Sequence, residues 1–291
     1  MQLQHSILLE TYWLTEEINL ILNELIPNII SIAQKAGDAT LDFWQKDIEV
    51  SHKQDDSPIT KADLAANQII IENLSKLTPD IPILSEEACS IDYAIRKNWK
   101  QWWLIDPLDG TKEFIAGNSD FTVNIALIDE GSVHFGVVFV PVTAICYVGG
   151  KHIGAWRIDK ERNKKAIHCN KSHKDSMSII ASQRHSSPKQ QSFLKQLATL
   201  TPFTQKNAGS SLKFCLIAEG KADCYPRFAP TCQWDTAAAQ GVLEGAGGNV
   251  FNENGDILNY EPRKDYLNPN FIALGDTSTW QKSIFELVKK L

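Results

Sequence analysis

Two aspartates lie close together in the chain, directly after a strongly apolar run. Residues 102–114 read WWLIDPLDGTKEF, so Asp106 and Asp109 follow four apolar residues and enclose a proline and a leucine. Two like charges about 4 Å apart repel by roughly 4 kcal/mol at an effective dielectric constant near 20, so the pair must be neutralised, protonated or splayed. Magnesium prefers oxygen ligands and commonly shares a substrate phosphate. The segment therefore indicates a metal site at a strand end, with an ordinary Asp-Gly turn as the alternative.

Further carboxylates stand at comparable positions. The run ILSEEA (83–88) ends a strand-like stretch in Glu86 and Glu87, and Asp235 begins the helical pattern of WDTAAAQGVLEG. Asp63 follows Thr60 by three residues in TKAD. Ordinary roles remain open: a solvated loop for the two glutamates, an N-cap for Asp235 and a capping box for Asp63.

Several residues are suited to contacting phosphate. Turns and helix starts expose backbone N–H groups, which bind anions, and nearby cations strengthen such sites. The alternative is that Ser210 caps a helix, Lys213 is solvated and Arg227 caps a turn. The candidates are Gly110 and Thr111 after the aspartate pair, Ser210, Ser211 and Lys213 in GSSLKF, and Arg227 in YPRF.

Composition narrows the class of protein. With 291 residues and 43% apolar residues, the chain can bury a sizeable core or two adjoining ones. A net charge of −6 gives no support to binding of polymeric nucleic acid. Six cysteines without a C-x-x-C pair, and no signal-peptide pattern, lead us to expect a reduced, cytoplasmic setting. The apolar opening segment (3–30) leaves open docking on the protein itself, on a partner, or peripherally on the cytoplasmic face of the inner membrane.

The predicted secondary structure differs between the two halves of the chain. Helical periodicity over 16–46 and 60–77 is followed by β-rich runs over 102–158, which predict a mainly antiparallel sheet. The charged stretch 159–175 lacks helical or strand period and is the expected joint. Beyond it, strands and helices alternate. We therefore expect an α/β, layered (α+β) protein with an N-terminal half over 1–158, carrying most metal ligands, and a C-terminal α/β half over 159–291.

The motifs SPITKAD, SEE, DPLDGTKEF and WDTAAA occur together and in this order. In this combination the chain resembles the inositol monophosphatase superfamily of magnesium-dependent, lithium-sensitive phosphatases. The segments FTVNIALI, GSSLKFCLIAEGKAD, YPRF and YLNPNF most resemble its bacterial CysQ type, the 3′(2′),5′-bisphosphate nucleotidases. The likeness covers about residues 26–275 and implies an αβαβα sandwich.

The resemblance also implies roles for residues. Glu86, Asp106 and the backbone carbonyl of Leu108 would bind one magnesium ion, and Asp106, Asp109 and Asp235 a second. Some members hold a third ion. Thr111 would orient the attacking water beside Glu86, with Asp63 as the acceptor behind its hydroxyl. Contacts to substrate would come from Glu86, Leu108, Asp109, Gly110, Thr111, Ser210, Ser211, Lys213, Arg227 and Asp235.

The implied activity is hydrolysis of the 3′-phosphate of adenosine 3′,5′-bisphosphate (PAP) to AMP and phosphate by metal-activated water. Its sulfated relative, 3′-phosphoadenosine 5′-phosphosulfate, would be a further substrate, which places the reaction in sulfur metabolism. An inositol monophosphatase or another sugar-phosphate phosphatase is the rival within the superfamily, and an inactive nucleotide-binding regulatory protein is the rival from another class. The expected partner is a small nucleotide bisphosphate, and the expected state is a monomer or homodimer.

Overall fold

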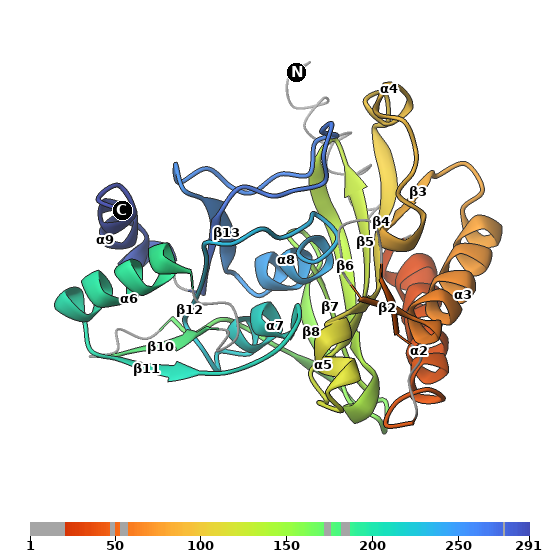
Figure 1. Cartoon of the computed structure of the whole chain (residues 1–291), viewed down its shortest axis with the longest axis horizontal. Coiled ribbons are helices and arrows are strands. Elements are labelled where there is room, and N and C mark those ends of the chain that lie inside the picture. Colours follow the sequence, from red (N-terminus) through yellow and green to blue (C-terminus); the bar gives the residue numbers. More distant parts are fainter. Residues whose placement is uncertain (1–20, 47–49, 53–57, 172–175, 182–186, 276) are drawn as a thin grey trace, which may run out of the picture.

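The chain stacks two β-sheets and three groups of helices into five alternating layers. The computed structural model describes residues 21–46, 50–52, 58–171, 176–181, 187–275 and 277–291. Figure 1 shows helices at the right, a large sheet, a central helical layer, a smaller sheet and further helices at the left. This order confirms the αβαβα architecture predicted from the sequence.

The large sheet is mainly antiparallel, as predicted. Its strands run in the order β3-β4-β5-β6-β7-β8-β9, and only the β3–β4 pair is parallel. Helices cover both faces of the central strands, so β5 and β6 are buried almost continuously rather than in alternation. The strands are β3 (Ile83–Ser85), β4 (Gln101–Asp109), β5 (Thr122–Asp129), β6 (Ser132–Val140), β7 (Ile145–Gly150), β8 (Gly154–Ile158) and β9 (Lys164–Ala166).

Two antiparallel helices cover the outer face of this sheet. They are α2 (Ile26–Leu41), which a π-helical turn η1 (Ile21–Leu25) precedes, and α3 (Lys61–Leu77). Ile29, Ala33 and Ala36 recur at helical spacing in α2 and are fully buried, so this stripe faces the sheet. The helix predicted over 16–46 thus ends earlier, and its residues 16–20 lie outside the described part of the chain.

The central layer packs between the two sheets and consists of α7 (Leu212–Ala218) and α8 (Ala237–Gly245). Helix α8 approaches β6 unusually closely. A Cβ atom built on Gly136 would lie only 2.1 Å from the carbonyl oxygen of Ala238. A glycine at position 136 therefore sets how deeply α8 sits against the sheet.

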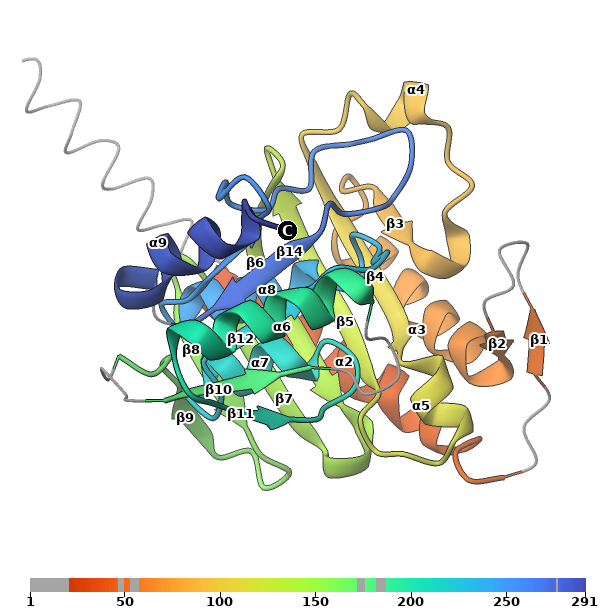
Figure 2. The same cartoon turned by 60° about the vertical axis from the view of Figure 1, so that its left-hand side comes forward.

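The smaller sheet has the order β11-β10-β12-β14-β13, with α6 and α9 on its outer face, as Figure 2 shows. Strands β10, β11 and β12 are parallel, whereas β12, β14 and β13 pair antiparallel. The alternation of strands and helices predicted beyond residue 175 is confirmed. The elements are β10 (Met177–Ile180), α6 (Pro188–Leu200), β11 (Phe203–Lys206), β12 (Cys224–Arg227), β13 (Asn249–Asn252), β14 (Phe271–Leu274) and α9 (Thr277–Val288).

The charged stretch 159–175 is not wholly irregular, and the interpretation that it lacks a strand was wrong for β9. In the described part of the chain this strand pairs with β8 alone, and it is exposed along its length. An edge strand rich in lysine has no buried face and therefore no alternating pattern. The large sheet thus continues past residue 158. Residues 172–175 of the stretch lie outside the described part of the chain.

The remaining short elements lie near the sheet ends. They are β1 (Val50–His52), which pairs with β2 (Pro58–Thr60), and the single turns η2 (Glu86–Ala88), α4 (Tyr93–Arg96), α5 (Thr111–Ile115) and η3 (Pro141–Thr143). All six cysteines are free thiols in this structure. Among the described residues, no helix combines the length and the apolar character needed to cross a membrane.

Candidate active site

A β-bulge brings Asp106 and Asp109 to the same face of the large sheet. In a regular strand, residues three apart point to opposite faces. Here the register shifts between the two aspartates, so that Asp106 pairs with Asn124 and Asp109 pairs with Thr122. Asn124 and Thr122 are two residues apart and share a face, and the aspartates therefore share it too. Pro107 lies in the bulge, where its missing N–H group costs no ladder hydrogen bond.

Asp109 is held by hydrogen bonds from two directions. Its Oδ2 atom accepts from the backbone N–H of Ser211 at 2.5 Å, from Asn124 Nδ2 at 3.4 Å and from Thr122 Oγ1 at 3.5 Å. The hydroxyl of Ser211 lies 2.8 Å from both Thr122 Oγ1 and Asn124 Oδ1. These contacts join the large sheet to the start of α7 and fix the orientation of the carboxylate.

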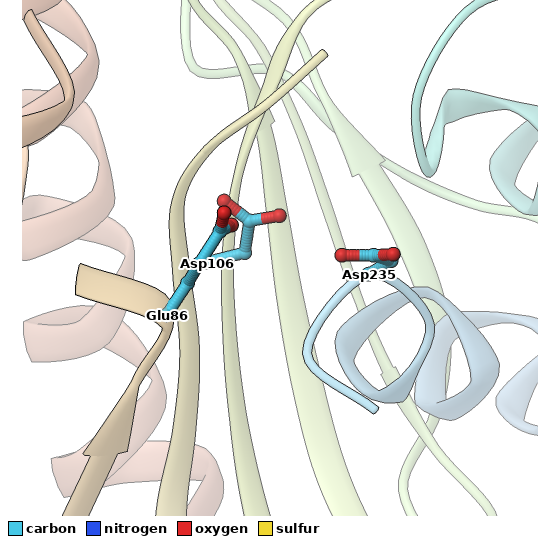
Figure 3. A group of neighbouring side chains, drawn as sticks. All are labelled: Glu86, Asp106 and Asp235. Atoms are coloured by element: carbon cyan, nitrogen blue, oxygen red, sulfur yellow. The ribbon is translucent and has the colours of Figure 1, made fainter. Parts of the chain in front are cut away.

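Three carboxylates converge from separate parts of the chain. Ligand atoms of Glu86, Asp106 and Asp235 all lie within 4.8 Å of one another. Glu86 follows β3 directly, and because β3 pairs in parallel with β4, it emerges beside Asp106. Asp235 lies opposite them in the turn before α8, and Figure 3 shows its carboxylate facing the other two.

Asp235 is not the N-cap of α8. That position belongs to Thr236, and the Oδ2 atom of Asp235 instead accepts from the backbone N–H of Cys232 at 2.9 Å. Its other oxygen can therefore be directed at the neighbouring carboxylates. The alternative of a simple helix cap, which the sequence left open, does not describe this residue.

The electrostatics of the cluster fit a bound cation. Burial raises the pKa of Asp109 to about 6, against the opposing effects of Lys213 and the Ser211 N–H group. Burial raises the pKa of Asp235 well above its usual range, and the charges of Asp109 and Glu86 raise it further. Oxygen donors alone, at short range and with excess negative charge, are the donor set that a hard divalent cation prefers.

Leu108 contributes a backbone carbonyl at the same place. Its N–H group donates to Asp106 Oδ1 at 3.0 Å, and its carbonyl oxygen lies 3.4 Å from Thr111 Oγ1, whose one proton is shared with the nearer Asp63. Leu108, although its side chain is buried, lines the cavity described below. The bulge thus presents a carbonyl oxygen between the two aspartates in the chain.

The hydroxyl of Thr111 reaches Asp63 on α3. Thr111 Oγ1 donates to Asp63 Oδ1 at 3.3 Å, while Asp63 Oδ2 accepts from the backbone N–H of Thr60 at 2.8 Å and from its hydroxyl at 2.6 Å. The capping box and the contact to Thr111 are therefore both present, one on each carboxylate oxygen. Burial raises the pKa of Asp63, against the opposing effect of the Thr60 hydrogen bonds.

The carboxylates open into a cavity of about 420 Å³. Gly110 at its wall has φ +94°, and a Cβ there would lie 2.1 Å from Ser210 Oγ, so both backbone and space require glycine. Ser210 Oγ donates to the carbonyl of Asp109 at 2.8 Å. Predicted site residues lining the cavity are Glu86, Asp106, Leu108, Asp109, Gly110, Thr111, Ser210, Lys213, Arg227 and Asp235.

Two predicted residues do not line the cavity. Asp63 is buried behind Thr111, and Ser211 is only 1% exposed, with its hydroxyl and N–H group directed at the sheet. Thr122 and Asn124, which hold Asp109, were not identified from the sequence. The available signal was a pair of polar residues two apart in β5, whose other residues before Asp129 are all apolar, and such a pair indicates a polar spot on one face.

Two cations, Lys213 and Arg227, line the same cavity as the carboxylates. Lys213 is 7% exposed and not solvated, and burial lowers its pKa to about 8 despite the charge of Asp109. Its Nζ atom lies 5.3 Å from the centre of the Tyr225 ring. Arg227 donates from Nε to Thr231 Oγ1 at 2.9 Å and from Nη2 to the Pro230 carbonyl at 3.2 Å, so it does brace a turn.

Comparison with known proteins gives consistent matches over most of the chain. The model of the "Inositol monophosphatase family" matches residues 22–291. The 3′(2′),5′-bisphosphate nucleotidase CysQ of Salmonella typhimurium is 42% identical over 249 residues, which is 85% of this chain and 98% of the relative. The CysQ of Haemophilus influenzae is 35% identical, covering 92% of this chain and 99% of the relative. The crystal structure of CysQ from Bacteroides thetaiotaomicron superimposes with a TM-score of 0.76 at 34% identity, covering 87% and 98% of the two chains.

Proposed function

Because the chain belongs to the inositol monophosphatase family, we propose that it is a bisphosphate nucleotidase that hydrolyses the 3′-phosphate of PAP to AMP and phosphate. The family implies dependence on a divalent metal, and the acidic cluster provides a fitting set of ligands. The printed names of the CysQ relatives support the activity. The test below also distinguishes this activity from the two alternatives, an inositol or other sugar-phosphate phosphatase and an inactive nucleotide-binding regulatory protein.

The observation that carries the proposal is that acidic and basic side chains line one cavity. Glu86, Asp106 and Asp235 converge at one place, and Lys213 and Arg227 line the same cavity. A substrate with two separated phosphates matches such a site, because one phosphate can share the cation while the other contacts the basic residues.

Magnesium is the proposed metal. One ion would be held by Glu86, Asp106 and the Leu108 carbonyl, and a second by Asp106, Asp109 and Asp235. Bound metal would stabilise the charge that develops on the phosphoryl oxygens and on the departing ribose oxygen. The donor atoms are oxygens throughout, which favours magnesium over softer-ligand metals.

The protein supplies a proton relay beside the cluster. Since Thr111 donates its hydroxyl proton to Asp63, the Thr111 oxygen is oriented to accept a proton from a water molecule. As that water attacks phosphorus, its proton passes to Thr111 and the hydroxyl proton of Thr111 passes to Asp63. The bond between phosphorus and the ribose 3′ oxygen breaks, the ribose oxygen takes a proton from solvent water, and Asp63 returns its proton to solvent. No covalent phosphoenzyme is formed.

Lys213 and Arg227 are proposed to bind the 5′-phosphate. Lys213 has a buried stem and faces the cavity, so a phosphate there would replace part of the hydration that its ammonium group lacks. Arg227 is pre-oriented by the turn at Pro230 and Thr231. The same contacts would accept the 5′-phosphosulfate of the sulfated relative.

The proposal is tested by measuring phosphate release from PAP, inositol 1-phosphate and fructose 1,6-bisphosphate with and without Mg²⁺. We expect a preference for PAP that requires Mg²⁺. A higher kcat/KM for inositol 1-phosphate would favour the monophosphatase rival. Binding of PAP without any phosphate release would favour the regulatory one.

A further inference from the structure

The three converging carboxylates come from two separate regions of the chain. Glu86 and Asp106 follow strands that pair directly with each other. Asp235 lies across from them on the turn before α8, as Figure 3 shows. The ladder that fixes the first pair does not reach Asp235. Packing of α8 on β6 sets the depth of this turn, and contacts that join the turn to η2 set the remaining distance between Asp235 and Glu86.

Residues 266–268, here called the tie segment, contact both regions. The first contact is made by Tyr266, whose hydroxyl donates to the backbone carbonyl of Cys89. Cys89 is the C-cap of η2, the single turn that begins with Glu86. The ring of Tyr266 also contacts Arg96, whose guanidinium carbon lies 4.5 Å from the ring centroid, and Trp234, whose ring centroid lies 5.0 Å away.

The second contact is made by Asn268. Its Nδ2 group donates to the carbonyl of Cys232 and to Thr236 Oγ1, both at 2.9 Å. The N–H group of Cys232 in turn donates to Asp235 Oδ2 at 2.9 Å. Asn268 thus closes the turn whose backbone holds the Asp235 carboxylate. Its amide orientation follows from the Cys232 carbonyl, which can accept only from the NH₂ side.

The backbone of the tie segment runs along the same turn. Gln233 N donates to the Tyr266 carbonyl at 2.8 Å, and Asn268 N donates to the Thr231 carbonyl at 2.9 Å. Leu267 between them is 45% exposed, so the extended chain points Tyr266 and Asn268 inward together. The tie segment is therefore joined to the Asp235 turn by backbone hydrogen bonds, and it contacts the Glu86 turn through the hydroxyl of Tyr266.

We infer that Tyr266 and Asn268 are positioning residues that set the separation of Glu86 and Asp235 and thereby the affinity for a divalent cation. The inference rests on the metal cluster of the proposed function. Mg²⁺ demands ligand geometry close to an ideal octahedron, and outer contacts that orient ligands commonly change metal affinity about 10- to 100-fold. The two side chains touch the backbones that carry the ligands, and no role in contacting substrate is assigned to them.

The test measures binding of Mg²⁺ alone by calorimetry, without substrate. In Tyr266→Phe, which removes a single oxygen, and in Asn268→Ala, we expect the Kd for Mg²⁺ to rise roughly 10-fold. The rise in thermal midpoint caused by a fixed Mg²⁺ concentration should shrink correspondingly. At saturating Mg²⁺, the kcat for PAP should return to near the wild-type value, which a generally damaged fold would not allow.

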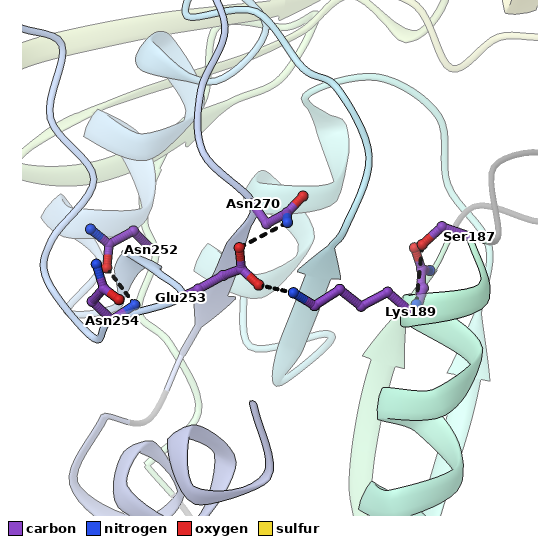
Figure 4. A network of polar contacts seen from close by, with 7 residues as sticks. Ser187, Lys189, Asn252, Glu253, Asn254 and Asn270 are labelled. Carbon is purple, nitrogen blue, oxygen red and sulfur yellow. Dashed lines mark hydrogen bonds and ion pairs between the residues drawn. The ribbon is translucent and has the colours of Figure 1, made fainter. Parts of the chain in front are cut away.

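Matched control variants show whether the loss of any side-chain hydrogen bond, and not only one in the tie segment, raises the Kd for Mg²⁺. Tyr147→Phe removes a hydroxyl bound to Glu219, and Asn270→Ala removes the 2.8 Å bond to Glu253 that Figure 4 shows two residues beyond the tie segment. Both should leave the Kd for Mg²⁺ unchanged. An unchanged Kd in Tyr266→Phe and Asn268→Ala, or an equal rise in the controls, would overturn the inference while leaving the proposed function intact. A wild-type protein that binds no Mg²⁺ would overturn both.

Discussion

Thr111 donates its hydroxyl to Asp63 over 3.3 Å, although the two residues are 48 positions apart in the chain. Asp63 accepts this hydrogen bond with Oδ1, while its Oδ2 atom closes the capping box of α3. One side chain therefore anchors the start of a helix and fixes the direction of a hydroxyl at the cavity wall. This dual use makes the two contributions separable by mutation.

The Asp63→Asn variant should lose activity and keep its fold. An asparagine has one acceptor oxygen, which can serve the capping box, so its NH₂ group would face Thr111 and reverse the hydrogen bond. We expect kcat for PAP to fall about 10²- to 10⁴-fold, and the free energy of unfolding to change by less than about 1 kcal/mol. Thr111→Val should lose a similar factor in kcat, whereas Thr111→Ser should retain most activity. Wild-type kcat in both Asp63→Asn and Thr111→Val would refute the relay.

The Asp109→Asn variant should lose most turnover in Mg²⁺ without unfolding. The amide oxygen can still accept from the Ser211 N–H group, which now lies 2.5 Å from Asp109 Oδ2. Because burial disfavours the charged form of Asp109, the metal-free variant should be at least as stable as the wild type in chemical denaturation. Its stabilisation by Mg²⁺ should be smaller. Unaltered turnover would remove Asp109 from the metal ligands.

The activity should depend on pH through Lys213. Burial lowers the pKa of Lys213 to about 8, so the free enzyme loses this charge as the pH rises through that value. The kcat/KM for PAP should therefore fall above pH about 8, and the fall should be absent in Lys213→Met and with inositol 1-phosphate as substrate. A pH profile that is identical for wild type and Lys213→Met would contradict the assignment of Lys213 to the 5′-phosphate.

The same shift makes a prediction about stability. The folded-state pKa lies below that of an unfolded lysine, near 10.4, so the unfolded chain binds more protons between these values. The cost of burying the charge is fully present below pH about 8 and is relieved as the pH rises further. We expect the free energy of unfolding of the wild type, measured by chemical denaturation, to rise relative to that of Lys213→Met between pH about 8 and about 10. A difference between the two proteins that stays constant over this range would contradict the prediction.

The Gly136→Ala variant should be destabilised. The added Cβ would lie 2.1 Å from the carbonyl oxygen of Ala238, and backbone at both positions leaves little room to yield. We expect a loss of about 1–3 kcal/mol in the free energy of unfolding, measured in urea. An unaltered unfolding midpoint would show that α8 can move away from β6 without cost.

The layers and the carboxylates could be predicted from the sequence because their signals are local. Apolar runs and helical periodicity located most strands and helices, and acids at the ends of such runs indicated the cluster. The bulge between Asp106 and Asp109 could not be predicted, since it depends on the register with Asn124 and Thr122 in β5. Strand β9 was missed because an exposed edge strand has no alternating pattern.

Contacts between segments that are distant in the chain could not be predicted from the sequence either. The buried position of Ser211 depends on β5, where its hydroxyl donates to Asn124 Oδ1 and forms a second hydrogen bond with the Thr122 hydroxyl. The contact of Tyr266 with Cys89 joins residues 177 positions apart. No periodicity reports such a pairing, and it becomes visible only once both sheets and α8 are assembled.

The central claim is that Glu86, Asp106 and Asp235 share a divalent cation at the cavity where phosphate is released. Anomalous diffraction from crystals soaked with Mn²⁺, AMP and phosphate tests it most directly. The account predicts a strong anomalous peak bounded by these three carboxylates and touching a phosphate oxygen. Bound product with no peak there, or a peak only at other acidic groups, would contradict it.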